Sequence, residues 1–287
     1  MMDNITKKQH YVPKAYLRFF ANMENKTYKT FVRFCKNMTN KYISIDNICC
    51  EKFLYEQIIS YPHEKGIVLY DANSIEKTFV DLEGSYHTIC ENIMKTACEN
   101  NIEISKEERY VLELFVSTLI FRGPKFVEVT KNISSVLYVR TKERLLSSMQ
   151  EIYEGIQVCE LKAALEHEIL NECVNSKVSV WVKAMQKTLE ESQLVLLKSE
   201  GAHFITSDMP VINLYGEENG EKFDLVGLPI TPNLFLTFID VGTALPNVIN
   251  VDNKTVMTFN EAQLRKGTTC LIAKDQADFS SILQNFK

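Results

Sequence analysis

Apolar residues between about residues 74 and 191 recur at spacings of three and four, which is the pattern of amphipathic helices. The first such stretch contains Ile75, Phe79, Leu82, Tyr86, Ile89, Ile93 and Met94. The next starts at a capping box, Ser105-Lys106-Glu107-Glu108, and stops at Gly123-Pro124. Two further helices are predicted at about 125–148 and 151–175, and a shorter one follows them. Helix packing must therefore organise the middle of this chain.

Short runs of strand character lie on both sides of the helical region. On the N-terminal side they are Tyr28–Phe34 and Tyr42–Ile48. On the C-terminal side they are 194–197, 203–206, 211–214, 234–239 and 269–272, punctuated by glycine and proline, with helices predicted at about 253–266 and 275–286. We predict an α+β fold in one domain, 1–287, with a helical subregion at about 74–191 and a β-rich subregion at about 193–287. The strands of the two terminal regions could share one sheet.

Charge is distributed unevenly along the chain. The 32 basic and 37 acidic residues give a net charge of −5, which argues against indiscriminate binding to nucleic acid or to an anionic membrane. Residues 1–45, however, contain nine Lys or Arg and two acids, a local balance of +7. This region allows a polyanionic partner such as nucleic acid, and a solvated rim of lysines is the alternative.

Motifs that would place the chain in a membrane or in a well-known enzyme class are absent. Its first residues do not form a secretory signal, and no apolar run approaches the roughly 18 residues that span a membrane. The eight cysteines form no CxxC pair and no cluster at zinc spacing, so we expect reduced thiols in a cytoplasmic protein without membrane contact. There is no phosphate loop, dinucleotide fingerprint or HExxH motif, which leaves nucleotide-driven, NAD-dependent and thermolysin-like functions unsupported.

The stretch Lys7–Phe20 combines polar groups with aromatic residues and predicts a buried polar cluster. His10 can serve as a base, an acid or a metal ligand at neutral pH. It can equally hydrogen-bond a neighbouring backbone group and fix the turn into Pro13. Arg18 offers a planar fork suited to phosphate or carboxylate.

Arg122 is expected to point inward, because its helix face carries Thr118, Phe115 and Val111. A buried arginine needs a partner, and Glu76, Glu83 and Asp208 are the candidates. These residues could form a purely structural ion-pair network. Glu76 follows Asn73 by three residues and could cap its own helix. It also lies two turns before Glu83 on one helix face, so both carboxylates could converge on one site.

The run Thr206-Ser207-Asp208-Met209-Pro210 forms a turn that displays a carboxylate at the end of a short strand. Ser207 lacks a Gly-x-Ser-x-Gly elbow and is not expected to be a nucleophile. Asp208, Glu76 and His10 together would make an oxygen-rich site with one imidazole, which suits Mg²⁺ or Mn²⁺.

Four places in the sequence are similar to a bacterial family, domain-of-unknown-function family 4238. They are Gln9–Pro13 with Tyr16–Phe20, Ile75–Lys77 with Leu82-Glu83, Phe121–Pro124, and Phe204–Val211 with Leu228–Pro232. They occur in the order and spacing of the family, over roughly residues 7–240. Met209 departs from the Asn that the family usually has between Asp and Pro. The resemblance implies no settled reaction, but it implies a role in mobile elements or in defence against phage.

Two functions are consistent with these residues. The first is a phosphodiester hydrolase, most simply a nuclease used in bacterial defence. In it His10 would be general base or metal ligand, Asp208 and Glu76 would hold a divalent ion, and Arg18 and Arg122 would stabilise charge on the phosphate. Tyr11, Tyr16 and Ser207 would contact the substrate. The second is a non-catalytic protein that senses or binds a small ligand and has a structural polar cluster.

Overall fold

Helices fill the middle of the chain, as the spacing of apolar residues predicts. The structure is a computed structural model that describes residues 6–56, 73–97, 102–152, 158–218, 221–240, 242–265 and 267–279. The helices of the middle region are α2 (Ser74–Thr96), α3 (Lys106–Phe121), α4 (Pro124–Ile152), α5 (Val158–Val174) and α6 (Val180–Glu191). The predicted capping box is confirmed: the Ser105 hydroxyl accepts the Glu108 N–H, and the Glu108 carboxylate accepts the Ser105 N–H. The predicted end of α3 is confirmed too, because Arg122 is its C-terminal cap.

Strands from the two ends of the chain share one sheet, as expected. The N-terminal elements are β1 (Lys8–His10), α1 (Lys14–Leu17), a 3-10 turn at Arg18–Phe20, β2 (Asn22–Glu24), β3 (Thr27–Phe34), β4 (Thr39–Ser44), a 3-10 turn at Ile45–Asn47, and β5 (Cys50–Lys52). The C-terminal strands β7 (Thr206–Ser207) and β12 (Cys270–Ala273) join this group, because β12 pairs antiparallel with β3 on one side and with β7 on the other. Separately, β1 pairs antiparallel with β5, and His10 lies opposite Cys50.

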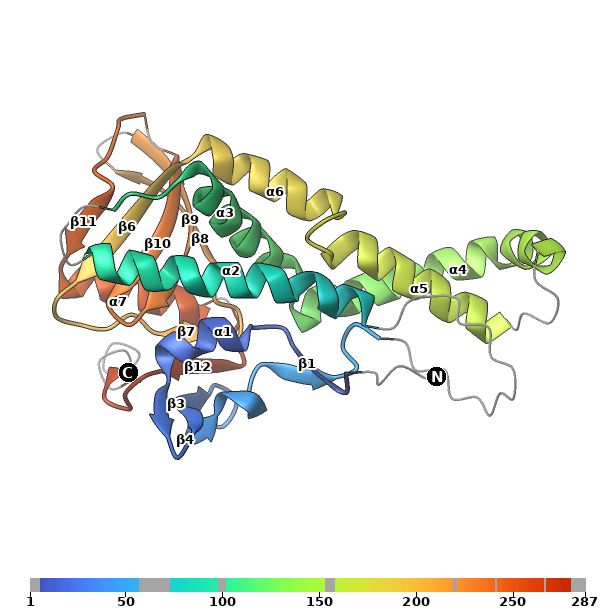
Figure 1. The fold of residues 1–287 in the computed structure, drawn as a ribbon, viewed down its shortest axis with the longest axis horizontal. Coiled ribbons are helices and arrows are strands. Elements are labelled where there is room, and N and C mark those ends of the chain that lie inside the picture. Colours follow the sequence, from blue (N-terminus) through green and yellow to red (C-terminus); the bar gives the residue numbers. More distant parts are fainter. Residues whose placement is uncertain are drawn as a thin grey trace.

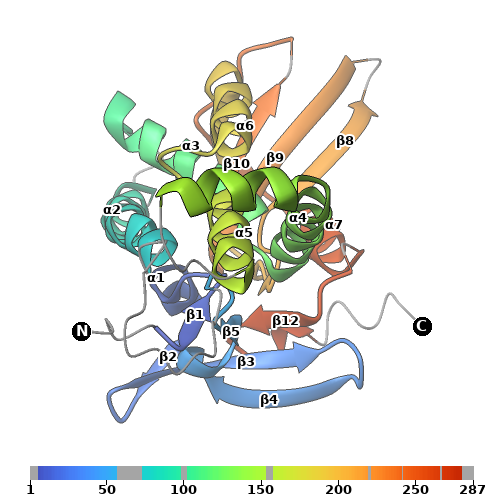
Figure 2. The same cartoon turned by 90° about the vertical axis from the view of Figure 1, so that its right-hand side faces the viewer.

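A second sheet is built entirely from the C-terminal region. Its strand order is β11-β6-β10-β9-β8, and β11 is parallel to β6 while the other pairs are antiparallel. The bounds are β6 (Gln193–Ser199), β8 (Ile212–Glu218), β9 (Glu221–Thr231), β10 (Leu234–Asp240), β11 (Val248–Val251) and, following them, α7 (Asn253–Arg265). In Figure 2 this sheet lies above, β3 and β4 lie below, and helices occupy the space between.

The two faces of the second sheet are buried against different partners. Along β10, Leu234, Leu236 and Phe238 belong to the large core shared with α1, α2 and α3. Phe235 points to the opposite face and packs with Val256 and Phe259 of α7. This alternation follows from the two-residue period of a strand and explains why apolar residues occupy both faces of β10.

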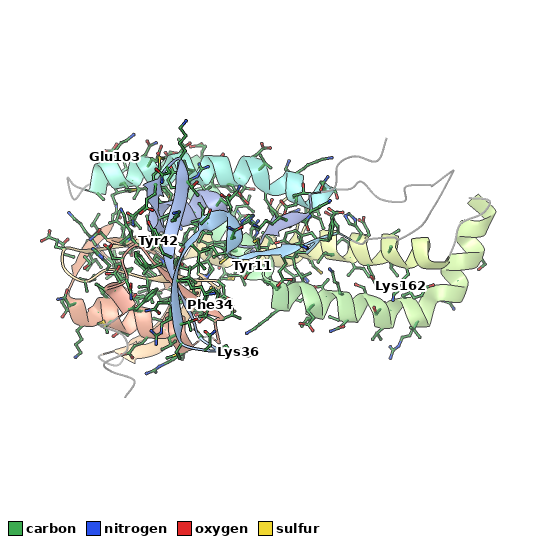
Figure 3. The ribbon with its side chains drawn as sticks, turned by 90° about the horizontal axis from the view of Figure 1, so that it is seen from below. Tyr11, Phe34, Lys36, Tyr42, Glu103 and Lys162 are labelled. Carbon is green, nitrogen blue, oxygen red and sulfur yellow. The ribbon has the colours of Figure 1, made fainter. Side chains whose placement is uncertain are left out.

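Helices α4 and α5 form a hairpin that extends away from the sheets (Figure 1). In Figure 3 Tyr11 lies near the base of this hairpin, and Lys162 of α5 lies further out along it. None of the helices in the described ranges is both long enough and apolar enough to cross a membrane.

Candidate functional site

A charged pocket of about 340 Å³ opens where β1, α1 and α2 meet the end of α3. Three cationic residues line it (Lys8, Lys14 and Arg122), together with three acidic residues (Asp46, Glu76 and Glu83). His10 and Thr6 complete the lining. Sequence segments more than a hundred residues apart therefore supply one concentrated polar site.

Arg122 lines the charged pocket, and only 2% of its surface is exposed. Its Nη1 donates to the Glu83 carboxylate at 3.0 Å, and its Nη2 donates to the His10 carbonyl at 2.5 Å. The guanidinium carbon lies 4.0 Å from the centre of the Phe79 ring, a cation–π contact. The Arg122 carbonyl accepts the hydroxyl of Tyr55 at 2.8 Å. The inward orientation predicted for Arg122 is confirmed, and its ion-pair partner is Glu83.

His10 is half-buried in this pocket, and its pKa falls from 6.5 to about 4. Burial is the main cause, because it penalises the charged imidazolium, and the positive charge of Lys14 acts in the same direction. A hydrogen bond with the Ile45 backbone opposes both effects. Nε2 is buried and has no hydrogen-bond partner within the described residues. A neutral imidazole with one vacant nitrogen therefore faces the charged pocket.

Glu76 shows the opposite behaviour, since its pKa rises from 4.5 to about 7. Burial is again the main cause; Arg122 partly offsets it, and the negative charge of Glu83 adds to it. The Glu76 Oε1 atom is buried and has no hydrogen-bond partner in the part of the chain that the structure describes. A carboxyl group that is about half protonated at neutral pH thus lines the same pocket as a neutral imidazole.

The predicted capping box of Asn73 and Glu76 is wrong. Asn73 has a left-handed backbone (φ 62°), and its side chain makes no cap hydrogen bond to α2. The Asn73 side chain instead accepts the Thr6 N–H at 2.8 Å, and the Asn73 N–H donates to Glu56 at 2.8 Å. Glu76 is therefore not part of a capping box, and it lines the charged pocket.

Lys8, Lys14 and Asp46 are pocket residues that the sequence interpretation missed. Lys14 forms an exposed ion pair with Asp46 at 3.1 Å, and this hydrogen bond is the main reason why the pKa of Asp46 is lowered. Lys8 donates to Asn47 at 2.6 Å. Lys8 could have been found from sequence, because it lies two residues before His10 and so on the same face of a strand. The sequence around Asp46 contains no comparable pattern that would place it in the pocket.

Asp208 lies in a different pocket, of about 610 Å³, which we call the apolar pocket. Its walls include Leu119, Phe126, Val129, Met209 and Val226, with Tyr11 and Thr269 beside Asp208. The Asp208 carboxylate accepts the Thr269 N–H, the Thr269 hydroxyl and the Cys270 N–H at 2.5–3.3 Å. These bonds fasten the Asp208 turn to the start of β12.

Comparison with known families assigns the chain. A family model described as a protein of unknown function (DUF4238) matches residues 8–277 of the 287 residues. The chain belongs to this family. Searches of curated proteins and of solved structures gave no match. The family resemblance of the opening motif and of the Asp208 turn is thus confirmed, while the reaction is not named by it.

In this DUF4238 protein the residues expected in one site divide between several places. His10, Glu76 and Arg122 line the charged pocket, whereas Tyr11 and Asp208 line the apolar pocket. The pKa of Tyr11 is raised, mainly by burial, and electrostatic interactions with Cys49 and Asp208 act in the same direction.

The other three expected residues lie in neither pocket lining. Arg18 is exposed and lies over the Tyr28 ring, 5.3 Å from its centre. Tyr16 is fully buried, and its hydroxyl donates to the Pro229 carbonyl at 2.7 Å. Ser207 is fully buried and donates to Gln263 at 2.8 Å. The arrangement of Tyr16 and Ser207 is that of core residues, since both are held by internal hydrogen bonds.

The donors expected for a divalent ion are not grouped in this DUF4238 chain. Across the described ranges, the ligand atoms close enough together to share one ion belong to His203, Asp275 and Asp278. His10 and Glu76 do share the charged pocket, but Asp208 is in the apolar pocket. The expected set of His10, Glu76 and Asp208 therefore does not surround one position.

Proposed function

We propose that this DUF4238 protein hydrolyses phosphodiester bonds in the charged pocket, as a nuclease used in defence against phage or mobile elements. One observation carries the proposal. Two buried titratable atoms, Glu76 Oε1 and His10 Nε2, have no hydrogen-bond partner among the described residues, and they share a pocket with three cationic side chains. Buried polar atoms without partners are rare in folded proteins and often mark sites that a ligand completes.

The two groups are matched as acid and base. Glu76, with a pKa of about 7, can deliver a proton to the leaving oxygen at neutral pH. The vacant Nε2 of neutral His10 can accept a proton from the attacking water. A bound phosphate would raise the pKa of His10, because it would offset the positive charge of Lys14 that helps to lower it.

The hydrolytic step balances with these groups alone. Water attacks phosphorus and gives a proton to His10 as the new P–O bond forms. The P–O bond to the leaving oxygen breaks, and Glu76 protonates that oxygen. Both residues then return to their starting states by proton exchange with solvent. Lys8 and Lys14 would hold the phosphate oxygens, and the fixed charge of Arg122 would stabilise negative charge developing at the back of the pocket.

Anion binding without turnover is a second candidate, and the state of Arg122 favours it. Its Nη1 and Nη2 groups are already engaged by Glu83 and by the His10 carbonyl, so the arginine fork does not open toward a substrate. In this case a ligand that carries a phosphate group would complete the hydrogen bonds of His10 and Glu76. It would then dissociate without having been cleaved.

The test is cleavage of single-stranded DNA, double-stranded DNA and RNA by the full chain, with EDTA, Mg²⁺ or Mn²⁺. Glu76→Gln and His10→Gln are each expected to lower the cleavage rate by roughly 100-fold or more, the usual size of an acid–base contribution. Glu91→Gln and His87→Gln, a pair on α2 outside the pocket lining, are the matched controls and should cleave like wild type.

The hydrolase proposal fails if wild type cleaves none of these substrates under any of the conditions. It also fails if the double variant Glu76→Gln/His10→Gln cleaves as fast as the controls. Chemical-shift changes of His10 on addition of inorganic phosphate, without cleavage of any substrate, would establish the binding function in its place.

A further inference from the structure

The apolar pocket contains a buried carboxylate that forms no salt bridge with a cationic residue of the described ranges. Asp208 is 7% exposed. It accepts hydrogen bonds on both oxygens, which is the behaviour of an ionised carboxylate. Within the described ranges no Lys, Arg or His forms a salt bridge with it. Buried charges are usually paired, so this one is a candidate for pairing with a ligand.

The donors that hold this carboxylate are all neutral. The Thr269 N–H lies within 3.1 Å of both oxygens, the Thr269 hydroxyl donates to Oδ2, and the Cys270 N–H donates to Oδ1. Each oxygen thus already accepts two contacts, and what these donors do not supply is a positive charge.

Lys125, the cationic residue of the pocket lining, forms no salt bridge with Asp208 in the described part of the chain. Lys125 is exposed and donates to the Gly267 carbonyl at 3.0 Å. Glu51 adds a second acid to the same lining, so acids outnumber bases around the pocket. A cationic ligand is electrostatically favoured there, and an anionic ligand is disfavoured.

The rest of the pocket suits a ligand whose remaining part is apolar. Most of its lining residues are apolar, among them Leu119, Phe126, Met209 and Val226, and the aromatic residue Tyr11 lines the pocket together with Asp208. Aromatic rings bind cations through their faces. The volume of about 610 Å³ lies inside the range of pockets that take small organic molecules, roughly 300–1,000 Å³.

We propose that the apolar pocket binds a small organic cation, with its ammonium or amidinium group against Asp208 and Tyr11 and its apolar body against Leu119 and Phe126. This site is separate from the hydrolytic site proposed above, and its ligand chemistry is opposite in charge. Either proposal can fail without the other.

The test is isothermal titration of the full chain with three probes that share one apolar body. They are 2-(2-naphthyl)ethylammonium, the neutral 2-(2-naphthyl)ethanol and the anionic 2-naphthylacetate. The cation is expected to bind at least about ten-fold more tightly than the other two, because only it can pair with the Asp208 charge. Asp208→Asn is expected to remove this preference.

A second variant keeps the test decisive if Asp208→Asn does not fold. Gly123 lines the apolar pocket, and a Cβ added there meets no atom within 4 Å, so Gly123→Leu is chosen to place a side chain at the pocket. Gly84→Leu is its matched control, because Gly84 also has open space and lies on α2 outside the pocket lining. Cation binding that is lost in Gly123→Leu and kept in Gly84→Leu supports the site. Equal binding of the three probes, no binding of the cation, or unchanged binding by Gly123→Leu would overturn it.

Discussion

The opposite pKa changes of His10 and Glu76 give the folded protein two opposing responses to pH. The perturbation is to remove each group by itself, as Glu76→Gln and as His10→Gln, and to follow stability from pH 4 to pH 8. The dominant cause of each change is burial of the group itself, so each variant should leave the response of the other group in place.

For Glu76 the sign follows from a pKa that is higher in the folded state. Between pH 4.5 and about 7 the folded protein binds more protons at Glu76 than the unfolded chain does. The contribution of Glu76 to stability is therefore complete below pH 4.5 and is lost as the pH rises to about 7. Each pKa unit corresponds to 1.36 kcal/mol, so the full change is about 3 kcal/mol.

For His10 the sign is reversed, because its pKa is lower in the folded state. Between pH 4 and 6.5 the unfolded chain binds more protons at His10 than the folded protein does. Stability therefore rises with pH across this window. We expect about 2 kcal/mol, less than the full shift implies, because the half-buried ring is partly screened by solvent.

Between pH 4.5 and 6.5 the contributions of Glu76 and His10 to the free energy of unfolding change in opposite directions. In the wild-type protein they should therefore largely cancel. Urea unfolding followed by circular dichroism at 222 nm gives the free energy of unfolding at each pH. Relative to wild type, Glu76→Gln should gain stability as the pH rises from 4.5 to 7, and His10→Gln should lose stability as the pH rises from 4 to 6.5. The controls Glu91→Gln and His87→Gln should run parallel to wild type. Differences between Glu76→Gln and wild type that stay constant with pH, within about 0.5 kcal/mol, would refute the assignment of Glu76 as a carboxyl group whose pKa is raised by burial.

Three further variants test the packing around the site. Arg122→Met leaves Glu83 without its partner and should lower the free energy of unfolding by about 3 kcal/mol in urea melts, and a loss below 1 kcal/mol would contradict the buried pair. Tyr16→Phe removes the hydroxyl that donates to the Pro229 carbonyl and should cost about 1–2 kcal/mol at an unchanged m-value; a change within 0.3 kcal/mol would mean that this hydrogen bond is not formed. Gly84→Ala should stabilise the protein by about 0.5–1 kcal/mol and raise its melting temperature, since Gly84 lies exposed in the middle of α2 with open space for a Cβ; a lower melting temperature would show that the site is crowded.

The features that sequence predicted well are those with local causes. The capping box at Ser105 depends on side chains three residues apart, and its outcome is the same in almost any tertiary context. The inward direction of Arg122 followed from the apolar face of its own helix, and burial then required a partner such as Glu83. The strand character of β3 and β10 likewise came from their own side chains.

The features that sequence missed depend on contacts between distant segments. Asn73 has the right spacing to Glu76 for a capping box, but its side chain binds Thr6 and its N–H binds Glu56. Competition from such partners is invisible in a window of four residues. Asp46 reaches the charged pocket only because the turn after β4 folds back toward Lys14. Nothing in the residues near Asp46 indicates this contact.

The division of the opening motif between two pockets has a simple geometric origin. Lys8 and His10 alternate with Gln9 along β1, so both face the charged pocket while Gln9 is buried on the other side, where it accepts the Tyr55 N–H. Tyr11 continues the alternation and lines the apolar pocket with Asp208. Motifs shared with a family can therefore be adjacent in sequence and still serve different sites. A shift of β1 by one residue against β5 would exchange the two faces, moving His10 away from Glu76 and Arg122. The β1–β5 register, with His10 opposite Cys50, thus keeps His10 on the lining of the charged pocket with Glu76 and Arg122.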